Sequence, residues 1–123
     1  MENRDNRKLS EGEYRLMDIL WEKGEMEASL LATVCFERFD WKKSTVYTML
    51  KRLGDKGAIR FEDRIVTALV DKEQVDRSES EALLDKAYRG SLPNFFAAFL
   101  QDRKITEEEA IKLTQMIKEA TKH

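Results

Sequence analysis

Apolar residues recur at intervals of three and four over the first half of the chain and predict three short helices, at about residues 11–23, 27–40 and 43–56. Ser10 and Glu13 form the capping-box pattern that begins a helix, so they fix the start of the first one. Gly24 follows its last apolar turn and should end it. Gly57 fits the left-handed position that ends the third helix.

The apolar and aromatic side chains of these helices should form one core. The second helix is expected to bury Leu30, Leu31, Val34 and Cys35, and Trp21 of the first helix should join them. Phe36, Phe39 and Trp41 then crowd the connection to the third helix. Packing of that corner is favoured over stacking on bases, because an intact duplex exposes few base faces.

The pattern changes period after Gly57. From Ile59 to Val70 the residues alternate in the way of strands, and Glu62-Asp63-Arg64 between them reads as a polar turn. This stretch therefore predicts a β-hairpin. Three helices followed by a hairpin is the order of a winged helix-turn-helix domain, so the expected fold class is mainly α with a small β-hairpin.

The last third of the chain predicts three more helices, which begin near Glu73, at Ser91 with Pro93 in the first turn, and at Thr106 with Glu109 as its capping partner. The middle helix is apolar around most of its circumference, which implies burial on more than one side. A second copy of the arm would supply the missing partner, and two-fold dimers are the commonest oligomer. The candidate dimerisation residues are Leu83, Leu84, Tyr88, Phe95, Phe96, Phe99, Leu100, Leu113 and Ile117.

The expected division of the chain is a flexible tail at residues 1–8, a DNA-binding winged helix at 9–72 and a helical dimerisation region at 73–123. Cys35 is the single cysteine and His123 the single histidine, so we expect neither a disulfide framework nor a metal site, and no cofactor. No nucleophile is paired with a central histidine and no glycine-rich phosphate loop occurs, which argues against an enzyme. The absence of a long apolar run or signal peptide predicts a cytoplasmic protein without a membrane partner.

The net charge of −2 conceals a basic segment. Residues 41–60 hold six lysines and arginines against one aspartate, a charge of +5, and they contain the third predicted helix. One face of that helix is apolar and the other carries lysines and hydroxyl groups, which suits a DNA major groove because cations meet phosphates and hydroxyls reach base edges. The alternatives are an ordinary solvated helix, or a winged-helix module that binds a protein partner and no DNA.

Two motifs resemble the penicillinase repressor family: Leu16-Met17-Asp18-Ile19-Leu20-Trp21, and Ser44-Thr45-Val46-Tyr47-Thr48-Met49-Leu50-Lys51-Arg52-Leu53 followed by Lys56-Gly57. The resemblance implies a homodimeric winged-helix repressor that binds a dyad-symmetric operator with its third helix in the major groove. It implies that Lys43, Ser44, Thr45, Tyr47, Thr48, Lys51 and Arg52 face double-stranded DNA. Lys42 of the basic segment and Arg60 and Arg64 of the hairpin complete the candidate DNA-binding set.

Three departures limit what the resemblance implies. The second hairpin strand lacks the family's usual aromatic residues, and the chain lacks the paired cysteines of a copper-responsive branch, so no copper response is expected. Members controlled by proteolysis are cut between asparagine and phenylalanine, whereas the aligned pair here is Ala98-Phe99. Asn94-Phe95 lies four residues earlier and makes a sensor protease a candidate partner, although a coincidental pair is the favoured interpretation.

Overall fold

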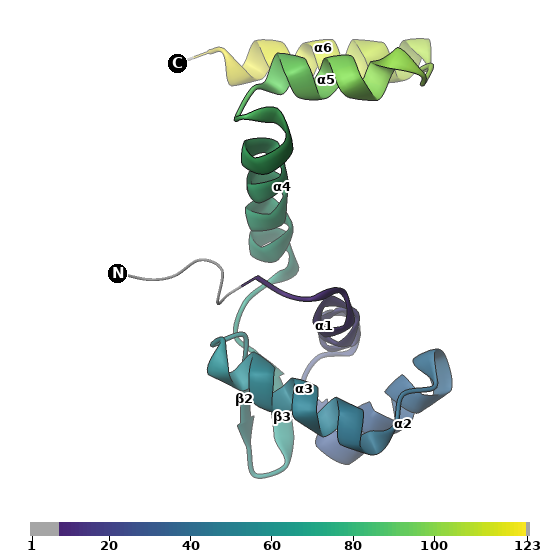
Figure 1. Ribbon diagram of the computed structural model, residues 1–123, viewed down its shortest axis with the longest axis vertical. Coiled ribbons are helices and arrows are strands. Elements are labelled where there is room, and N and C mark those ends of the chain that lie inside the picture. Colours follow the sequence, from purple (N-terminus) through teal and green to yellow (C-terminus); the bar gives the residue numbers. More distant parts are fainter. Residues whose placement is uncertain (1–7, 123) are drawn as a thin grey trace. The chain divides into compact units, whose positions relative to one another are not determined.

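A computed structural model describes residues 8–122, and the N-terminal tail predicted at residues 1–8 falls almost entirely outside them. The chain divides into two compact units, one that ends at Glu79 and one that begins at Ser80. The first unit contains α1 (Glu11–Lys23), α2 (Ala28–Phe39) and α3 (Lys43–Asp55), followed by a small sheet (Figure 1). This confirms the predicted order of three helices and a hairpin.

The ends of α1 follow from the residues expected to set them. The Glu13 N–H donates to Ser10 Oγ at 3.1 Å, and the Ser10 N–H donates to Glu13 Oε1 at 2.8 Å, which completes the capping box. At the other end, Gly24 has φ 84° and its N–H donates to the Leu20 carbonyl at 2.8 Å. The positive φ is the reason that glycine suits this position.

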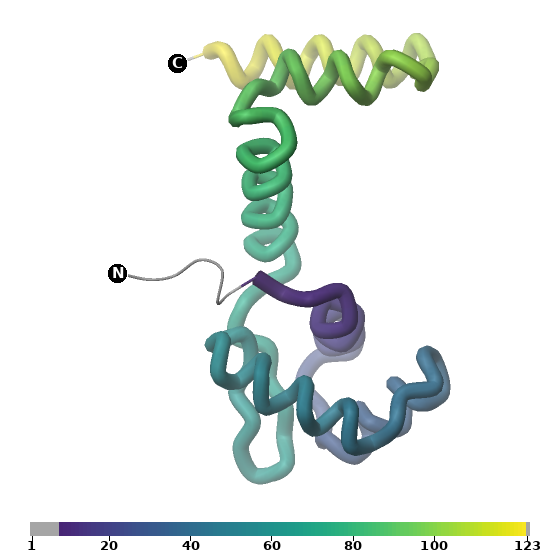
Figure 2. The backbone as a smooth tube through the Cα atoms, in the orientation of Figure 1, coloured from purple at the N-terminus to yellow at the C-terminus, as the bar shows by residue number. Residues whose placement is uncertain are grey.

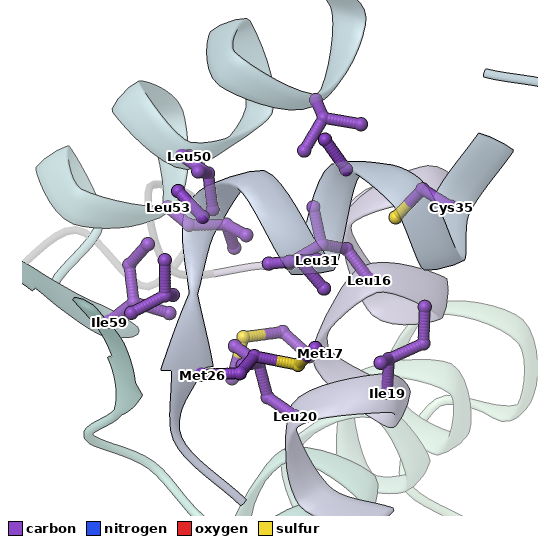
Figure 3. Close-up of a cluster of buried hydrophobic side chains, with 14 of the residues drawn as sticks. Leu16, Met17, Ile19, Leu20, Met26, Leu31, Cys35, Leu50, Leu53 and Ile59 are labelled. Carbon is purple, nitrogen blue, oxygen red and sulfur yellow. The ribbon is translucent and has the colours of Figure 1, made fainter. Parts of the chain in front are cut away.

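The core of the first unit lies where its three helices meet. Leu16 and Met17 of α1, Leu31 of α2, and Leu50 and Leu53 of α3 are fully buried, and Figure 3 shows their side chains grouped with Met26 and Ile59. Burial of these side chains stabilises the fold by about 2 kcal/mol each. The core holds α3 by one face and leaves its other face free.

The sheet has three strands rather than the two of the predicted hairpin. β2 (Ile59–Glu62) and β3 (Ile65–Ala68) pair antiparallel, and Figure 2 shows the tight turn between them. β1 (Met26–Glu27) adds to the other edge of β3, which gives the order β1-β3-β2. Sequence reasoning missed β1 because a strand of two residues is too short to show any alternation.

The hairpin of β2 and β3, which we call the wing, has a turn that is hydrogen-bonded to the start of α2. The two residues of the turn, Asp63 and Arg64, have φ 51° and 69°, a left-handed pair that matches the twist of a two-residue hairpin. The N–H of Ala28 donates to the Arg64 carbonyl at 2.9 Å. No side chain of the described residues caps α2, so this backbone contact satisfies one of its first amides.

Two expectations about the second helix were wrong. Leu30 is 53% exposed and Phe36 is 61% exposed, so neither belongs to the core. The helical pattern placed Leu30 beside Leu31, but only one of two consecutive residues can face the core fully. Phe39 and Trp41 do pack together, with ring centroids 4.7 Å apart, and the Cys35 side chain is buried as expected, which raises the pKa of its thiol to about 11.

α4 (Lys72–Tyr88) crosses the division between the two units. The second unit contains the end of α4 together with α5 (Leu92–Gln101) and α6 (Glu107–Ala120). Ser91 Oγ accepts from the Asn94 N–H, and Thr106 and Glu109 form a capping box, as predicted. None of the residues of α4, α5 or α6 is fully buried within the single chain.

Candidate nucleic-acid interface

α3 has two faces of opposite character. Val46, Leu50 and Leu53 point into the core with at most 1% of their surface exposed. The other side presents a basic and hydroxyl-rich surface, which we call the α3 face: Lys42, Lys43, Ser44, Thr45, Tyr47, Thr48, Lys51 and Arg52. All of these are exposed except Tyr47, which is half-buried. The structure therefore brings eight of the ten candidate DNA-binding residues onto one helix and its first cap.

Local contacts fix the orientation of several α3-face side chains. The Thr48 hydroxyl donates to the Ser44 carbonyl at 3.0 Å, so its lone pairs remain available as acceptors. The Lys43 ammonium lies 5.8 Å from the Tyr47 ring centroid, and the Tyr47 and Phe61 rings are 6.3 Å apart. Tyr47 is thus held between a cation of its own helix and the wing.

The start of α3 suits an anion. No described side chain caps its first amides, its first turn has no acidic residue, and Lys42 occupies the cap position beside Lys43. Free amides and the positive end of the helix dipole attract negative charge such as a phosphate. The electrostatics of the backbone and of the two lysines therefore act in the same direction.

A buried ion pair anchors the far end of α3. The Lys56 ammonium donates to Glu13 Oε1 at 2.5 Å and also to the Lys8 carbonyl at 2.8 Å. Burial raises the pKa of Glu13, but the bonds from Lys56 and Ser10 together lower it more, so it lies below its ordinary value. Sequence reasoning assigned Glu13 only to the capping box, since nothing in the spacing indicates a partner 43 residues later.

The two wing arginines lie in different settings. Phe61 faces Tyr47 of α3, and because side chains alternate along a strand, the adjacent Arg60 points to the opposite face of β2. There its guanidinium lies 4.0 Å from the Glu62 carboxylate. Arg64 is exposed at the turn itself. Of the pair, only Arg64 is carried at the tip of the wing.

Among residues 8–122 no group of three or more histidine, cysteine, aspartate or glutamate side chains is arranged to hold a metal ion. None of the helices described is long and apolar enough to cross a membrane.

The chain is similar in sequence to proteins that are described as repressors and regulators. The penicillinase repressor of Bacillus licheniformis is 24% identical over 115 residues, which cover 90% of each chain. The methicillin resistance regulatory proteins MecI of Mammaliicoccus sciuri and of Staphylococcus aureus strain N315 are 24% identical over 113 residues, 89% of this chain and 92% of theirs. The solution structure of the DNA-binding domain of the repressor BlaI matches with a TM-score of 0.49 and 25% identity, and covers 58% of this chain and 90% of that one.

A sequence profile settles the family. The profile described as Penicillinase repressor matches residues 9–119, which is nearly all of the described chain. This confirms the resemblance seen in the motifs of the first and third helices. The chain belongs to the penicillinase repressor family, a family of transcriptional repressors and not of enzymes.

Proposed function

We propose that this protein represses transcription in the cytoplasm by binding a dyad-symmetric operator as a homodimer, with α3 in the major groove of each half-site. The observation that carries the proposal is the α3 face, which is basic and exposed on a helix whose opposite side is locked in the core. A rigid helix with cations and hydroxyl groups on its free side has the shape and the chemistry to read a groove.

The α3 face supports a division of labour between phosphate and base contacts. Lys51 and Arg52 would neutralise phosphates, as would Lys42 and Lys43 beside the uncapped start of the helix. Ser44, Thr45, Tyr47 and Thr48 would meet base edges. Arg64 would reach the backbone from the wing tip, while Arg60 would contribute less because it shares its strand face with Glu62.

The second unit supports a dimer. Its apolar side chains have no fully buried position in the single chain, and Leu83, Phe99, Leu100 and Ile117 are each at least 41% exposed. Leu84, Tyr88, Phe95, Phe96 and Leu113 are half-buried beside them. Covering such a surface with a second copy would remove apolar area from water. In this proposal residues 9–72 bind DNA and residues 73–123 form the dimer.

Footprinting on the DNA upstream of the protein's own gene should reveal a protected dyad. On that DNA, Lys51→Ala and Arg52→Ala should weaken binding to every duplex and reduce the salt slope by about one ion each. Thr45→Ala and Tyr47→Phe should mainly relax the preference for the operator over random DNA. Lys86→Ala is the matched control, because it removes an exposed cation of α4 and should change neither property. If none of the α3 variants alters binding to any promoter fragment, the α3 face is not a specific DNA-binding surface, and the alternative of a protein-binding module gains support.

For relief of repression we infer that the Asn94-Phe95 pair is coincidental. The Asn94 N–H is bonded to Ser91 Oγ, an ordinary role for the first turn of a helix. Another ligand, or a sensor protease of different specificity, would then release the repressor.

A further inference from the structure

The start of α4 is tied to α1 by a connected group of side chains, which we call the junction clamp: Tyr14, Asp18, Trp21, Lys72 and Asp76. All five belong to the first compact unit. The Tyr14 hydroxyl donates to Asp76 Oδ1 at 2.6 Å, and the Lys72 ammonium donates to the Tyr14 oxygen. Lys72 Nζ also lies 3.5 Å from the Asp76 carboxylate and 3.8 Å from that of Asp18.

Aromatic contacts extend the clamp to the backbone that enters α4. The Lys72 ammonium lies 4.8 Å from the Tyr14 ring centroid and 5.5 Å from that of Trp21, and the two rings pack edge to face at 5.4 Å. The Trp21 indole N–H donates to the Val70 carbonyl at 2.9 Å. Val75 in the first turn of α4 packs against the core. The chain is therefore held before the helix, at its first residue and one turn later.

The protonation states match this bonding. The hydrogen bond to Asp76 raises the pKa of Tyr14, and the hydrogen bond to Tyr14 raises the pKa of Lys72. At neutral pH the tyrosine is thus a donor and the lysine a cation, as the contacts require. Exposed ion pairs alone contribute little to stability, so the main effect expected of the clamp is on the orientation of α4 and not on the free energy of unfolding.

We propose that Tyr14 and Lys72 are positioning residues that fix the direction in which α4 leaves the winged helix, and so set the half-site spacing that the dimer accepts. This rests on the proposed binding of a dyad by a homodimer. α4 runs without interruption from Lys72 to Tyr88, so an error in its first turn is carried into the residues that lead to the dimer. Two recognition helices must match half-sites at a fixed separation, which makes the exit direction of each α4 part of operator recognition.

The test uses the full-length dimer and two substitutions that keep side-chain size. Tyr14→Phe deletes only the hydroxyl, and Lys72→Met deletes the ammonium with its charge and its hydrogen bond to Tyr14. Arg77→Met is the matched control, since Arg77 is an exposed cation of the same helix with no ion pair among residues 8–122. Affinity is measured on the footprinted operator and on versions with one or two base pairs added to or removed from the spacer.

The wild type and Arg77→Met should discriminate strongly between spacers. In Tyr14→Phe and Lys72→Met the affinity for the natural spacer should fall by about five-fold, the factor expected for one net hydrogen bond, while the altered spacers change little. Binding to an isolated half-site should stay the same, because no clamp residue belongs to the α3 face. An unchanged spacer preference in both variants would overturn the proposal.

A second measurement tests, without DNA, whether the clamp fixes the direction of α4 against α1. Spin labels are attached through Lys23→Cys in α1 and Ser78→Cys in α4, two exposed positions of the first unit, in protein diluted with unlabelled chain so that only distances within a chain are seen. Tyr14→Phe should broaden the distance distribution relative to wild type and to Arg77→Met. A distribution that stays equally narrow overturns the clamp. If the wild type binds only single half-sites, the proposed binding of a dyad is wrong. The distance distribution would still show whether the clamp fixes the start of α4 against α1.

Discussion

Glu13 joins two contacts that are usually made by different residues. One carboxylate oxygen accepts the Ser10 N–H in the capping box of α1 and the Lys56 ammonium at the end of α3. Because the residue is only 2% exposed, water cannot replace either partner. The start of α1 and the end of α3 are thereby fixed to the same atom.

Glu13→Gln should lower the free energy of unfolding by on the order of 2 kcal/mol, because Lys56 loses its counter-charge at a largely dry site. The loss should stay below that of a fully buried pair, since the Lys56 side chain is 23% exposed. Glu11→Gln, which breaks the exposed Glu11–Arg15 pair of the same helix, is the control and should cost less than about 0.5 kcal/mol. Urea denaturation measures both, and equal losses would contradict the buried pair.

The same contact predicts a pH dependence. The pKa of Glu13 is lowered by folding, so the unfolded carboxyl takes up its proton at higher pH than the folded one. The stabilisation is then complete above the unfolded pKa of about 4.3 and is lost as pH falls through the lower folded pKa. The difference in unfolding free energy between wild type and Glu13→Gln should shrink over that acidic range. A difference that is constant with pH would rule out the charged form as its source.

At the scale of elements, the sequence predicts the helices well, because their apolar positions recur over several turns. The spacing of Leu16, Leu50 and Leu53 and the caps at Ser10 and Thr106 predicted helices within a residue or two of their true ends. β1 could not be predicted, because Met26 and Glu27 become a strand only when β3 lies beside them. The Glu13–Lys56 pair and the junction clamp could not be predicted for a similar reason, because both join residues that are distant in sequence.

The exposed apolar surface of α5 and α6 leads to a prediction about assembly. Phe99→Asp and Leu113→Asp should each yield monomer and abolish operator binding, because an interface phenylalanine contributes about 2 kcal/mol and a charge in its place must be desolvated. Leu30→Asp is the control, as Leu30 is an apolar residue that is 53% exposed but lies on α2. Sedimentation gives the mass, and circular dichroism checks that the helices persist. Dimers that survive both α5 and α6 changes would refute the assignment.

At the scale of the whole molecule, induction by proteolysis would require α5 to open. A protease holds its substrate extended, so the helix must unfold locally before cleavage. Phe95 contacts the rings of Tyr88, Phe96 and Phe99, and these contacts oppose that opening. An activated sensor protease of this family should therefore leave the chain intact during incubation.

Sequencing of the fragments separates the alternatives. A cut after Asn94 that disappears in Asn94→Ala would show that the Asn94-Phe95 pair is a functional site. A cut after Ala98 would show that the protease selects a position in the arm rather than a residue type. Either result would contradict the prediction of an intact chain.

The boundary between the two units lies inside α4, and this limits where related repressors can recombine to give functional hybrids. Val75 and Asp76 belong to the winged unit although they lie in the helix that leads out of it. Recombination that joined two relatives at the start of α4 would separate these residues from Tyr14 and the core. A crossover after Glu79 would keep both sets of contacts within one parent, so functional hybrids should share their junction in the middle of this helix.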